Sequence, residues 1–240
     1  MYESIQTLSA LIGAGLIGYS GYGITTGIRQ VISSIRREQE ESYEVTPWQI
    51  AAGYNNVGGY RHPVIFDFKK TPHMLVTGLS QQGKTSMVEG ALRNKQVLLL
   101  NTFREDFRSI KAVERVNDPV EIQKVLEYLL TIQENEIPLY VVIDELLNLI
   151  LSGDKKILPL ITRLLAVAAH KNIYIIAISQ YADKESVKNK NLFNIRVCFK
   201  LVEDSSYKTV LGYTPDNLQL EPRQFHYLAE GTGTAYTYDT

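Results

Sequence analysis

The chain has 240 residues, of which 45% are hydrophobic and 21% are charged, a balance typical of a well-filled globular domain and not of a disordered chain. Its 25 Lys and Arg residues and 26 Asp and Glu residues give a net charge of -1, which excludes a uniformly basic coat for nucleic acid and requires any such contact to be local. The single cysteine, Cys198, excludes an internal disulfide, and the four histidines give no zinc-ligand spacing with it.

The first predicted element is a transmembrane helix within residues 1–28. Residues 4–28 carry no charge, and a helix of roughly 20 apolar residues is enough to cross a bilayer. The glycines in this stretch are tolerated in lipid, where they let helices approach closely. Glu3 precedes the stretch and Arg29 and Arg36 follow it, so the positive-inside rule places the rest of the chain on the cytoplasmic side. The alternative is a glycine-rich arm that packs on a partner or lies on the bilayer surface.

A charged linker helix and a soluble α/β domain are expected next, at residues 29–47 and 48–240. In the linker, basic residues are followed by a block of acidic residues. In the domain, short apolar runs without polar alternation recur between helical patterns. This order predicts a mostly parallel sheet that is covered by helices on both faces. The expected strands lie at 64–68, 73–78, 96–103, 138–144, 173–179 and 195–201, and the expected helices lie after Lys84 and at 119–133, 156–170 and 206–211.

The sharpest motif follows the expected strand at 73–78, where GLSQQGKT satisfies GxxxxGK[ST] between a strand and a helix. Backbone N–H groups of such a loop and the positive end of the next helix surround the phosphates of ATP, Lys84 adds a mobile cation, and the Thr85 hydroxyl binds Mg²⁺. An ordinary glycine turn is the alternative. The predicted nucleotide-binding residues are Gly78, Ser80, Gln81, Gln82, Gly83, Lys84, Thr85 and Ser86.

A second motif, LYVVIDE at residues 139–145, is a buried strand that ends in two carboxylates, where a parallel sheet opens onto a crevice. Asp144 suits the shell of a Mg²⁺ ion, and Glu145 suits the activation of the attacking water, which predicts hydrolysis of ATP. A favourable charge at a helix N-terminus is the alternative role for Glu145. The strand at 173–179 is followed by Gln180, whose amide could contact the γ-phosphate or the water.

Taken in order, these motifs resemble the FtsK/SpoIIIE–HerA family of DNA-pumping motor ATPases over about residues 59–211. The sequence departs from that family at Ser80-Gln81-Gln82, where relatives usually have Thr-Gly-Ser, and at Ala169, where cellular members carry an arginine. The matching segments are RHPVIFDF (61–68), TPHMLVTG (71–78), VVIDELLNLI (141–150), ITRL (161–164), NIYIIAISQ (172–180) and NIRVCFK (194–200).

The resemblance implies a RecA-like P-loop fold and a homo-oligomeric ring, typically a hexamer, in which ATP hydrolysed between subunits drives double-stranded DNA through a channel. An arginine of the neighbouring subunit would complete each site, with Arg163 and Arg196 as catalytic candidates. Lys208 is a poor substitute because it lacks the planar fork. Lysines in the channel loops would contact the DNA backbone without reading sequence, and solvated surface lysines are the alternative. The predicted DNA-contacting residues are Lys155, Lys156, Lys184, Lys188 and Lys190.

The resemblance and the predicted anchor together favour a membrane-anchored DNA translocase that packages a viral genome, similar to the ATPases of tectivirus-type, membrane-containing phages. Such a protein would lie at a cell membrane or at the internal membrane vertex of a virion, beside portal, capsid or small membrane proteins. A conjugative transfer ATPase of a plasmid or mobile element is the first alternative. A nucleotide-dependent phage or membrane assembly factor, which would remodel proteins instead of moving DNA, is the second.

Overall fold

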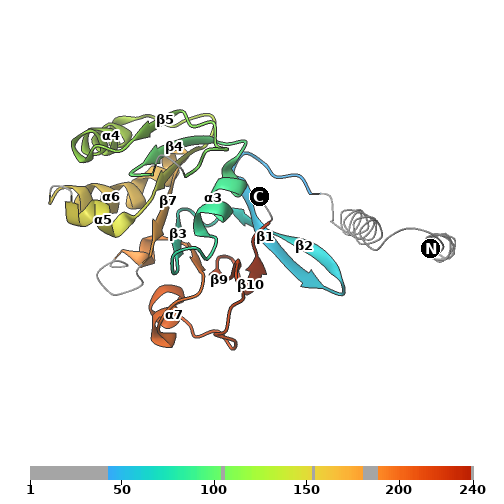
Figure 1. Cartoon of the computed structure of the whole chain (residues 1–240). Coiled ribbons are helices and arrows are strands. Elements are labelled where there is room, and N and C mark those ends of the chain that lie inside the picture. Colours follow the sequence, from blue (N-terminus) through green and yellow to red (C-terminus); the bar gives the residue numbers. More distant parts are fainter. Residues whose placement is uncertain (1–42, 104–105, 153–154, 181–188, 239–240) are drawn as a thin grey trace, which may run out of the picture. The chain divides into compact units, whose positions relative to one another are not determined.

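The computed structural model describes residues 43–103, 106–152, 155–180 and 189–238 (Figure 1). The chain divides into two units, Met1–Ser42 with Gly58–Arg61, and Tyr43–Val57 with His62–Thr240. The predicted anchor at 4–28 and most of the predicted linker lie outside the described residues. Among the residues that are described, no helix combines the length and the apolar character needed to cross a membrane.

A ten-stranded sheet forms the centre of the second unit, in the order β2-β1-β10-β9-β8-β3-β7-β6-β4-β5. The strands from β8 to β5 run parallel, which confirms the predicted mostly parallel α/β sheet. The strands are β1 (Gln49–Val57), β2 (Tyr60–Asp67), β3 (Met74–Thr77), β4 (Gln96–Leu100), β5 (Glu114–Val116), β6 (Leu139–Ile143), β7 (Ile173–Ser179), β8 (Ile195–Cys198), β9 (Gln224–Leu228) and β10 (Thr232–Tyr236).

The other end of the sheet is antiparallel, which the strand–helix alternation did not predict. β9 pairs antiparallel with both β8 and β10, and β10 pairs antiparallel with β1. β2, expected as a strand buried on both faces, is instead the edge strand beside β1, and Ile65 is exposed. Only Gly58 and Gly59 separate β1 from β2, and a connection this short can join only antiparallel strands.

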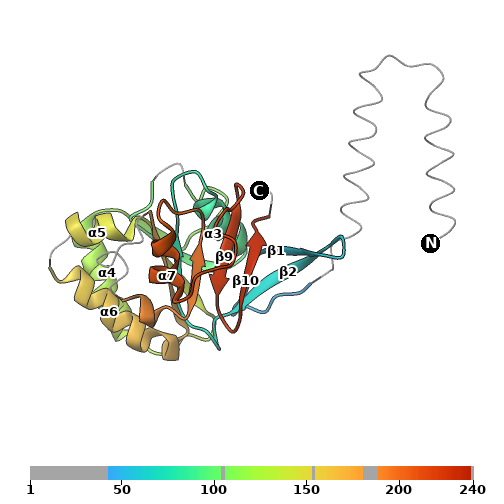
Figure 2. The same ribbon diagram turned by 90° about the horizontal axis from the view of Figure 1, so that it is seen from below.

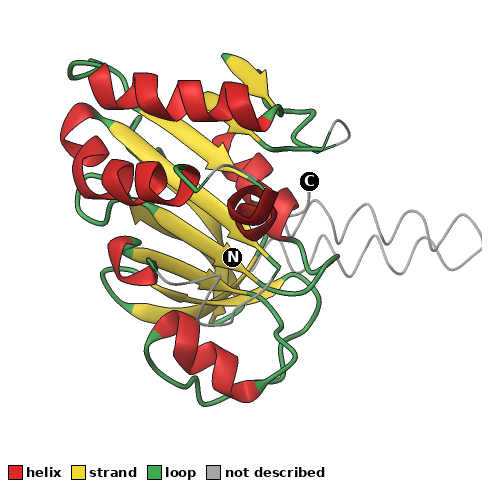
Figure 3. Ribbon diagram, turned by 90° about the vertical axis from the view of Figure 1, so that its left-hand side faces the viewer, coloured by secondary structure: helices red, strands yellow, loops and turns green. Residues whose placement is uncertain are grey.

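Helices cover both faces of the parallel strands (Figures 2 and 3). Residues of four helices share a core with one face, whereas residues of α3 share a core with the other. Adjacent residues of one strand serve the two cores, because successive side chains of a strand point to opposite faces: Leu75 belongs to the first core and Val76 to the second. The helices are α3 (Lys84–Leu92), α4 (Pro119–Thr131), α5 (Leu146–Ser152), α6 (Ile157–Val167) and α7 (Asp204–Leu211), with short 3-10 helices at Ala168–Lys171 and Lys190–Leu192.

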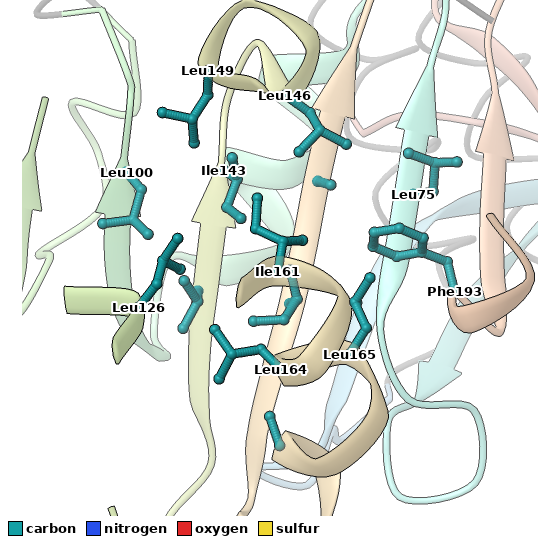
Figure 4. Packing of buried hydrophobic residues seen from close by; sticks show 14 of the residues in the cluster. Leu75, Leu100, Leu126, Ile143, Leu146, Leu149, Ile161, Leu164, Leu165 and Phe193 are labelled. Carbon is teal, nitrogen blue, oxygen red and sulfur yellow. The ribbon is translucent and has the colours of Figure 1, made fainter. Parts of the chain in front are cut away.

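The packing of α6 fixes the position of the chain that follows β6. Ile161, Leu164 and Leu165 are buried at helical spacing and lie over the strands that contain Ile143 and Leu75 (Figure 4). Each such side chain stabilises the fold by roughly 1.5–3 kcal/mol when it leaves water. Because α5 and α6 follow β6 directly, this packing also restrains the turn that carries the two predicted carboxylates.

His73, directly before β3, is buried with 1% of its surface exposed and has a left-handed backbone (φ 63°). Its Nδ1 accepts a hydrogen bond from the backbone N–H of Ile175 at 3.0 Å, which ties the start of β3 to β7. Burial lowers the pKa of His73 to about 4, so the imidazole is neutral in the folded protein. The unfolded chain takes up a proton there near pH 6.5, well before the folded chain does.

We therefore expect the free energy of unfolding to fall as the pH drops from 6.5 towards 4, with a contribution from His73 of roughly 3 kcal/mol. His73→Asn removes this contribution, and asparagine tolerates the left-handed backbone. The measurement is urea unfolding of both proteins between about pH 7 and pH 4.5. If both proteins lose the same free energy of unfolding between about pH 7 and pH 4.5, His73 is not the group responsible for the loss.

Candidate active site

The residues of the phosphate-loop motif connect β3 directly to α3, as the sequence predicted. Gly78 and Gly83 have φ values of 144° and 104°, in the region that favours glycine. Lys84 begins α3 and is buried, and its Nζ donates to the carbonyls of Gly78 and Leu79, both at 2.8 Å. The side chain of Lys84 therefore folds back and bonds the first two residues of its own loop.

The start of the loop lies against the segment that follows β8. The N–H of Phe199 donates to the carbonyl of Thr77, and the N–H of Leu79 donates to the carbonyl of Lys200, both at 2.9 Å. A Cβ at Gly78 would lie only 2.6 Å from the Cβ of Phe199. Glycine is thus required at this position by the close approach of two backbones as well as by its dihedral angle.

The two predicted carboxylates stand in a turn at the end of β6. Asp144 is buried, with 4% exposed, and its Oδ1 accepts from the N–H of Glu145, which is half-buried and has a φ of 49°. Asn101, directly after β4, donates to the carbonyl of Asp144 at 2.9 Å and holds the turn from the neighbouring strand. Burial, and then the charge of Glu145, raise the pKa of Asp144 to about 6. Two close, partly desolvated carboxylates of this kind favour a bound cation.

Gln180 connects the loop to the carboxylates. It follows β7, which lies between β3 and β6 in the sheet. Its Oε1 accepts a hydrogen bond from the hydroxyl of Ser80 at 2.8 Å, and its Nε2 donates to Oε1 of Glu145. Ser80 and Glu145, which follow β3 and β6, are therefore joined through the side-chain amide of Gln180, which follows β7.

Two cavities flank the loop and α3. The smaller, about 220 Å³, is lined by Gln81, Gly83, Lys84, Thr85, Ser86 and Arg223. The larger, about 780 Å³, extends along α3 and shares Ser86 with the smaller one; Gly90 of α3 and Ala52 of β1 also line it. The sequence did not single out Arg223, because it lies in a segment without a motif and reaches the loop only through the pairing of β9 with β8.

The donor groups fit a nucleoside triphosphate with Mg²⁺. Loop N–H groups, the first turn of α3 and the Lys84 ammonium suit phosphate oxygens, and the Thr85 hydroxyl and the Asp144 carboxylate are oxygen ligands of the kind that Mg²⁺ prefers. In the described part of the chain, no group of three or more His, Cys, Asp or Glu side chains could hold a metal by itself. A magnesium ion would thus depend on phosphate oxygens for part of its shell.

The two candidate arginines line neither cavity. Arg163 is exposed on α6. Arg196 of β8 donates from Nε to the carbonyl of Phe193 at 3.1 Å and from Nη1 to the carbonyl of Val210 at 3.3 Å. Burial lowers the pKa of Arg196. Arg196 thus holds the end of α7 within its own chain.

The candidate DNA-binding lysines differ in their surroundings. Lys155 and Lys156 are exposed directly before α6. Lys190 is half-buried, and its Nζ donates to the carbonyl of Thr209. Burial, and then the charge of Arg196, lower the pKa of Lys190. The remaining two candidates, Lys184 and Lys188, lie outside the described residues.

No protein-family model matches the sequence, and no curated protein matches it. Among solved structures, the pCW3 conjugation coupling protein TcpA with ATPγS is 18% identical, with a TM-score of 0.64 over 81% of this chain and 67% of that chain. The cytoplasmic domain of the type VII secretion ATPase EccC of Thermomonospora curvata is 13% identical, with a TM-score of 0.64 over 84% of this chain and 30% of that chain. The genome packaging NTPase B204 of Sulfolobus turreted icosahedral virus 2, in complex with AMPPCP, is 11% identical, with a TM-score of 0.53 over 70% of this chain and 99% of that chain.

The fold is that of the P-loop NTPases, and the chain carries the GxxxxGK[ST] motif of that fold between β3 and α3. At these identities the comparisons show a shared fold, and at that level they confirm the resemblance predicted from the sequence. This chain covers 30% of the EccC structure and 46% of the structure of EssC (ATPases 2 and 3) from Geobacillus thermodenitrificans, so it spans less than half the length of either.

We expect Gly78→Ala to destabilise the protein by about 1–3 kcal/mol and to weaken nucleotide binding, since the added Cβ collides with Phe199 and the backbone is strained. Gly231→Ala is the control, because its Cβ would meet nothing within 4 Å. Thermal unfolding and titration with a fluorescent ADP analogue measure the two effects. If Gly78→Ala has the same stability and nucleotide affinity as Gly231→Ala, the close approach of Gly78 to Phe199 would be contradicted.

Proposed function

We propose that this protein is a RecA-like P-loop ATPase that hydrolyses ATP with Mg²⁺ and, as a homo-oligomeric ring, moves double-stranded DNA. The observation that carries the proposal is the chain of contacts from Ser80 through Gln180 to Glu145, beside a closed phosphate loop. A loop that only held a nucleotide would not require a carboxylate and a polar amide at the adjoining strand ends.

The residues of this chain have separate roles in the proposed reaction. Lys84 would exchange its two carbonyl acceptors for phosphate oxygens, which are stronger acceptors because they are charged. Thr85 and Asp144 would hold Mg²⁺, which neutralises charge on the phosphates. Glu145 would orient the attacking water and accept its proton, and Gln180 holds the Glu145 carboxylate in place.

Gln180 also suits a role in coupling hydrolysis to movement. It bonds both to the phosphate loop and to the proposed base, so a γ-phosphate that arrives between them would change its contacts. The segment that directly follows Gln180 contains three of the lysines predicted to contact DNA. A change at the nucleotide would therefore pass into that segment over a short length of chain.

The adenosine end of the nucleotide would lie in the larger cavity along α3. Ser86 belongs to the lining of both cavities, and the lining of the larger one includes the small residue Ala52 and the aromatic residue Tyr238. A cavity of about 780 Å³ is within the range of small-molecule sites.

We expect both Lys84→Ala and Glu145→Gln to lower the rate of ATP hydrolysis by at least about 100-fold. Lys84→Ala should also weaken binding of ATP, whereas Glu145→Gln should keep it, because Glu145 acts on the water and not on the phosphates. The exposed Lys111→Ala and Glu134→Gln are the matched controls. Phosphate release and nucleotide titration are the measurements, and hydrolysis that persists in either site variant would refute the assigned roles.

Packaging of a viral genome is the favoured use of the motor. This chain aligns with 99% of the packaging NTPase B204, at 11% identity. Conjugative DNA transfer remains the alternative, because the coupling protein TcpA gives the higher TM-score of 0.64. In either use, a ring would repeat Lys155 and Lys156 around a channel, and Arg163 is the preferred arginine to complete a neighbouring site.

The membrane is the third part of the proposal. The uncharged stretch at 4–28, with basic residues after it, supports an anchor that keeps the ATPase domain on the cytoplasmic side or at the internal membrane vertex of a virion. Portal, capsid or small membrane proteins would be neighbours there.

We expect double-stranded DNA to raise the rate of ATP hydrolysis. Replacing Lys155 and Lys156 by Glu should lower DNA affinity and its salt dependence but leave basal hydrolysis intact, because each phosphate contact releases counterions. Lys111→Glu with Lys124→Glu is the charge-matched control, since both lysines are exposed. If DNA leaves the rate of ATP hydrolysis unchanged, and particle assembly requires residues 4–28, the assembly factor would be favoured instead.

A further inference from the structure

Arg223 reaches the phosphate loop from the side opposite to the carboxylates. It directly precedes β9, which pairs with β8, and β8 lies on one side of β3, whereas β7 and β6 lie on the other. The small cavity over the loop includes Arg223 among its lining residues. The loop is therefore flanked by an arginine on one side and by Asp144 and Glu145 on the other.

The backbone fixes Arg223 in this place. Its φ is 67°, a left-handed value that non-glycine residues seldom adopt, and its carbonyl accepts from the N–H of Thr237 at 3.0 Å. In the same turn, Glu221 and Gln224 exchange two hydrogen bonds of 3.0 Å each. A Cβ at Gly83 would lie 3.4 Å from Cγ of Arg223, so the stem of this side chain packs directly on the loop. Strained backbones that are held this firmly are common at ligand sites.

The charge of the cavity indicates its ligand. Its lining holds two cations, Lys84 and Arg223, and no carboxylate, and it opens at the positive end of α3. A phosphate chain, which carries several charged oxygens, can accept hydrogen bonds from both of these cations and from the N–H groups that begin α3. The guanidinium offers a planar fork that bonds two phosphate oxygens at once.

We propose that Arg223 binds the α- and β-phosphates of the nucleotide within its own subunit. This assignment rests on the proposed function and adds to it a binding residue that is distinct from the arginine of a neighbouring subunit. Thr85 and Ser86 lie in the first turn of α3 and line the same cavity, which places this contact at the part of the nucleotide that ADP and ATP share. Arg223 is separated by the loop from Glu145, so it positions the nucleotide and takes no part in activating the water.

The test is Arg223→Asn, because asparagine tolerates the left-handed backbone and removes the guanidinium together with the stem that packs on the loop. Mg²⁺ with ADP, and Mg²⁺ with a non-hydrolysable ATP analogue, are titrated calorimetrically into wild type, the variant and Lys111→Asn, which loses the same charge at an exposed position. We expect both dissociation constants to rise roughly tenfold or more in Arg223→Asn. Hydrolysis at saturating ATP should stay near the wild-type rate, and Lys111→Asn should match wild type throughout.

Arg223→Lys is the second variant, since it keeps the charge and loses the fork; a smaller rise in both constants would support the assignment even if Arg223→Asn fails to fold. Unchanged affinity in the Arg223 variants would overturn the proposal. So would a loss confined to the ATP analogue, or a fall in the hydrolysis rate at unchanged affinity. Failure of wild type itself to bind either nucleotide would instead refute the proposed ATPase, and is recognised before any variant is compared.

Discussion

The candidate site depends on the register of three neighbouring parallel strands. Thr77 of β3 pairs with Ser179 of β7, and Ile143 of β6 pairs with Ala177 of β7, so all three strands end at the same edge of the sheet. That register brings Gln180 between the phosphate loop and the carboxylates. A slip of one residue would turn the side chains of a strand to the opposite face and separate the groups. The two buried cores hold the register in place from both sides.

Burial and charge oppose each other at this edge. Burial lowers the pKa of Lys84, and the nearby charges of Glu145 and Asp144 act in the opposite direction. Burial likewise raises the pKa of Asp144, while Lys84 lowers it. The Lys84 ammonium and the nearby carboxylates thus each favour the charged form of the other, against the effect of burial. Such an arrangement suits a ligand that brings both negative phosphates and a magnesium ion, because each would find its counter-charge already positioned.

The departure of the loop from the family pattern has a structural counterpart. Gln81 stands where the FtsK/SpoIIIE–HerA family that the sequence resembles usually has glycine, and it adopts a left-handed φ of 61°, which glycine would adopt more easily. Ser80, which replaces the threonine usual in relatives, supplies the hydroxyl that bonds Gln180. The loop thus contains a non-glycine residue in a left-handed conformation, in agreement with the less permissive backbone that the sequence suggested.

The sequence by itself determined the loop between β3 and α3, the acidic end of β6 and the polar end of β7, because each is encoded locally by an apolar run and the residues that directly follow it. It did not predict the β9–β10 hairpin, and hence not the place of Arg223, because that depends on pairing with β8 across a long stretch of intervening chain. The roles of Arg196 and Lys190 were likewise decided by tertiary structure, since each bonds backbone carbonyls of other elements. A motif predicts the local structure that adjacent residues form. Which residues from distant parts of the chain lie beside that structure is determined by packing.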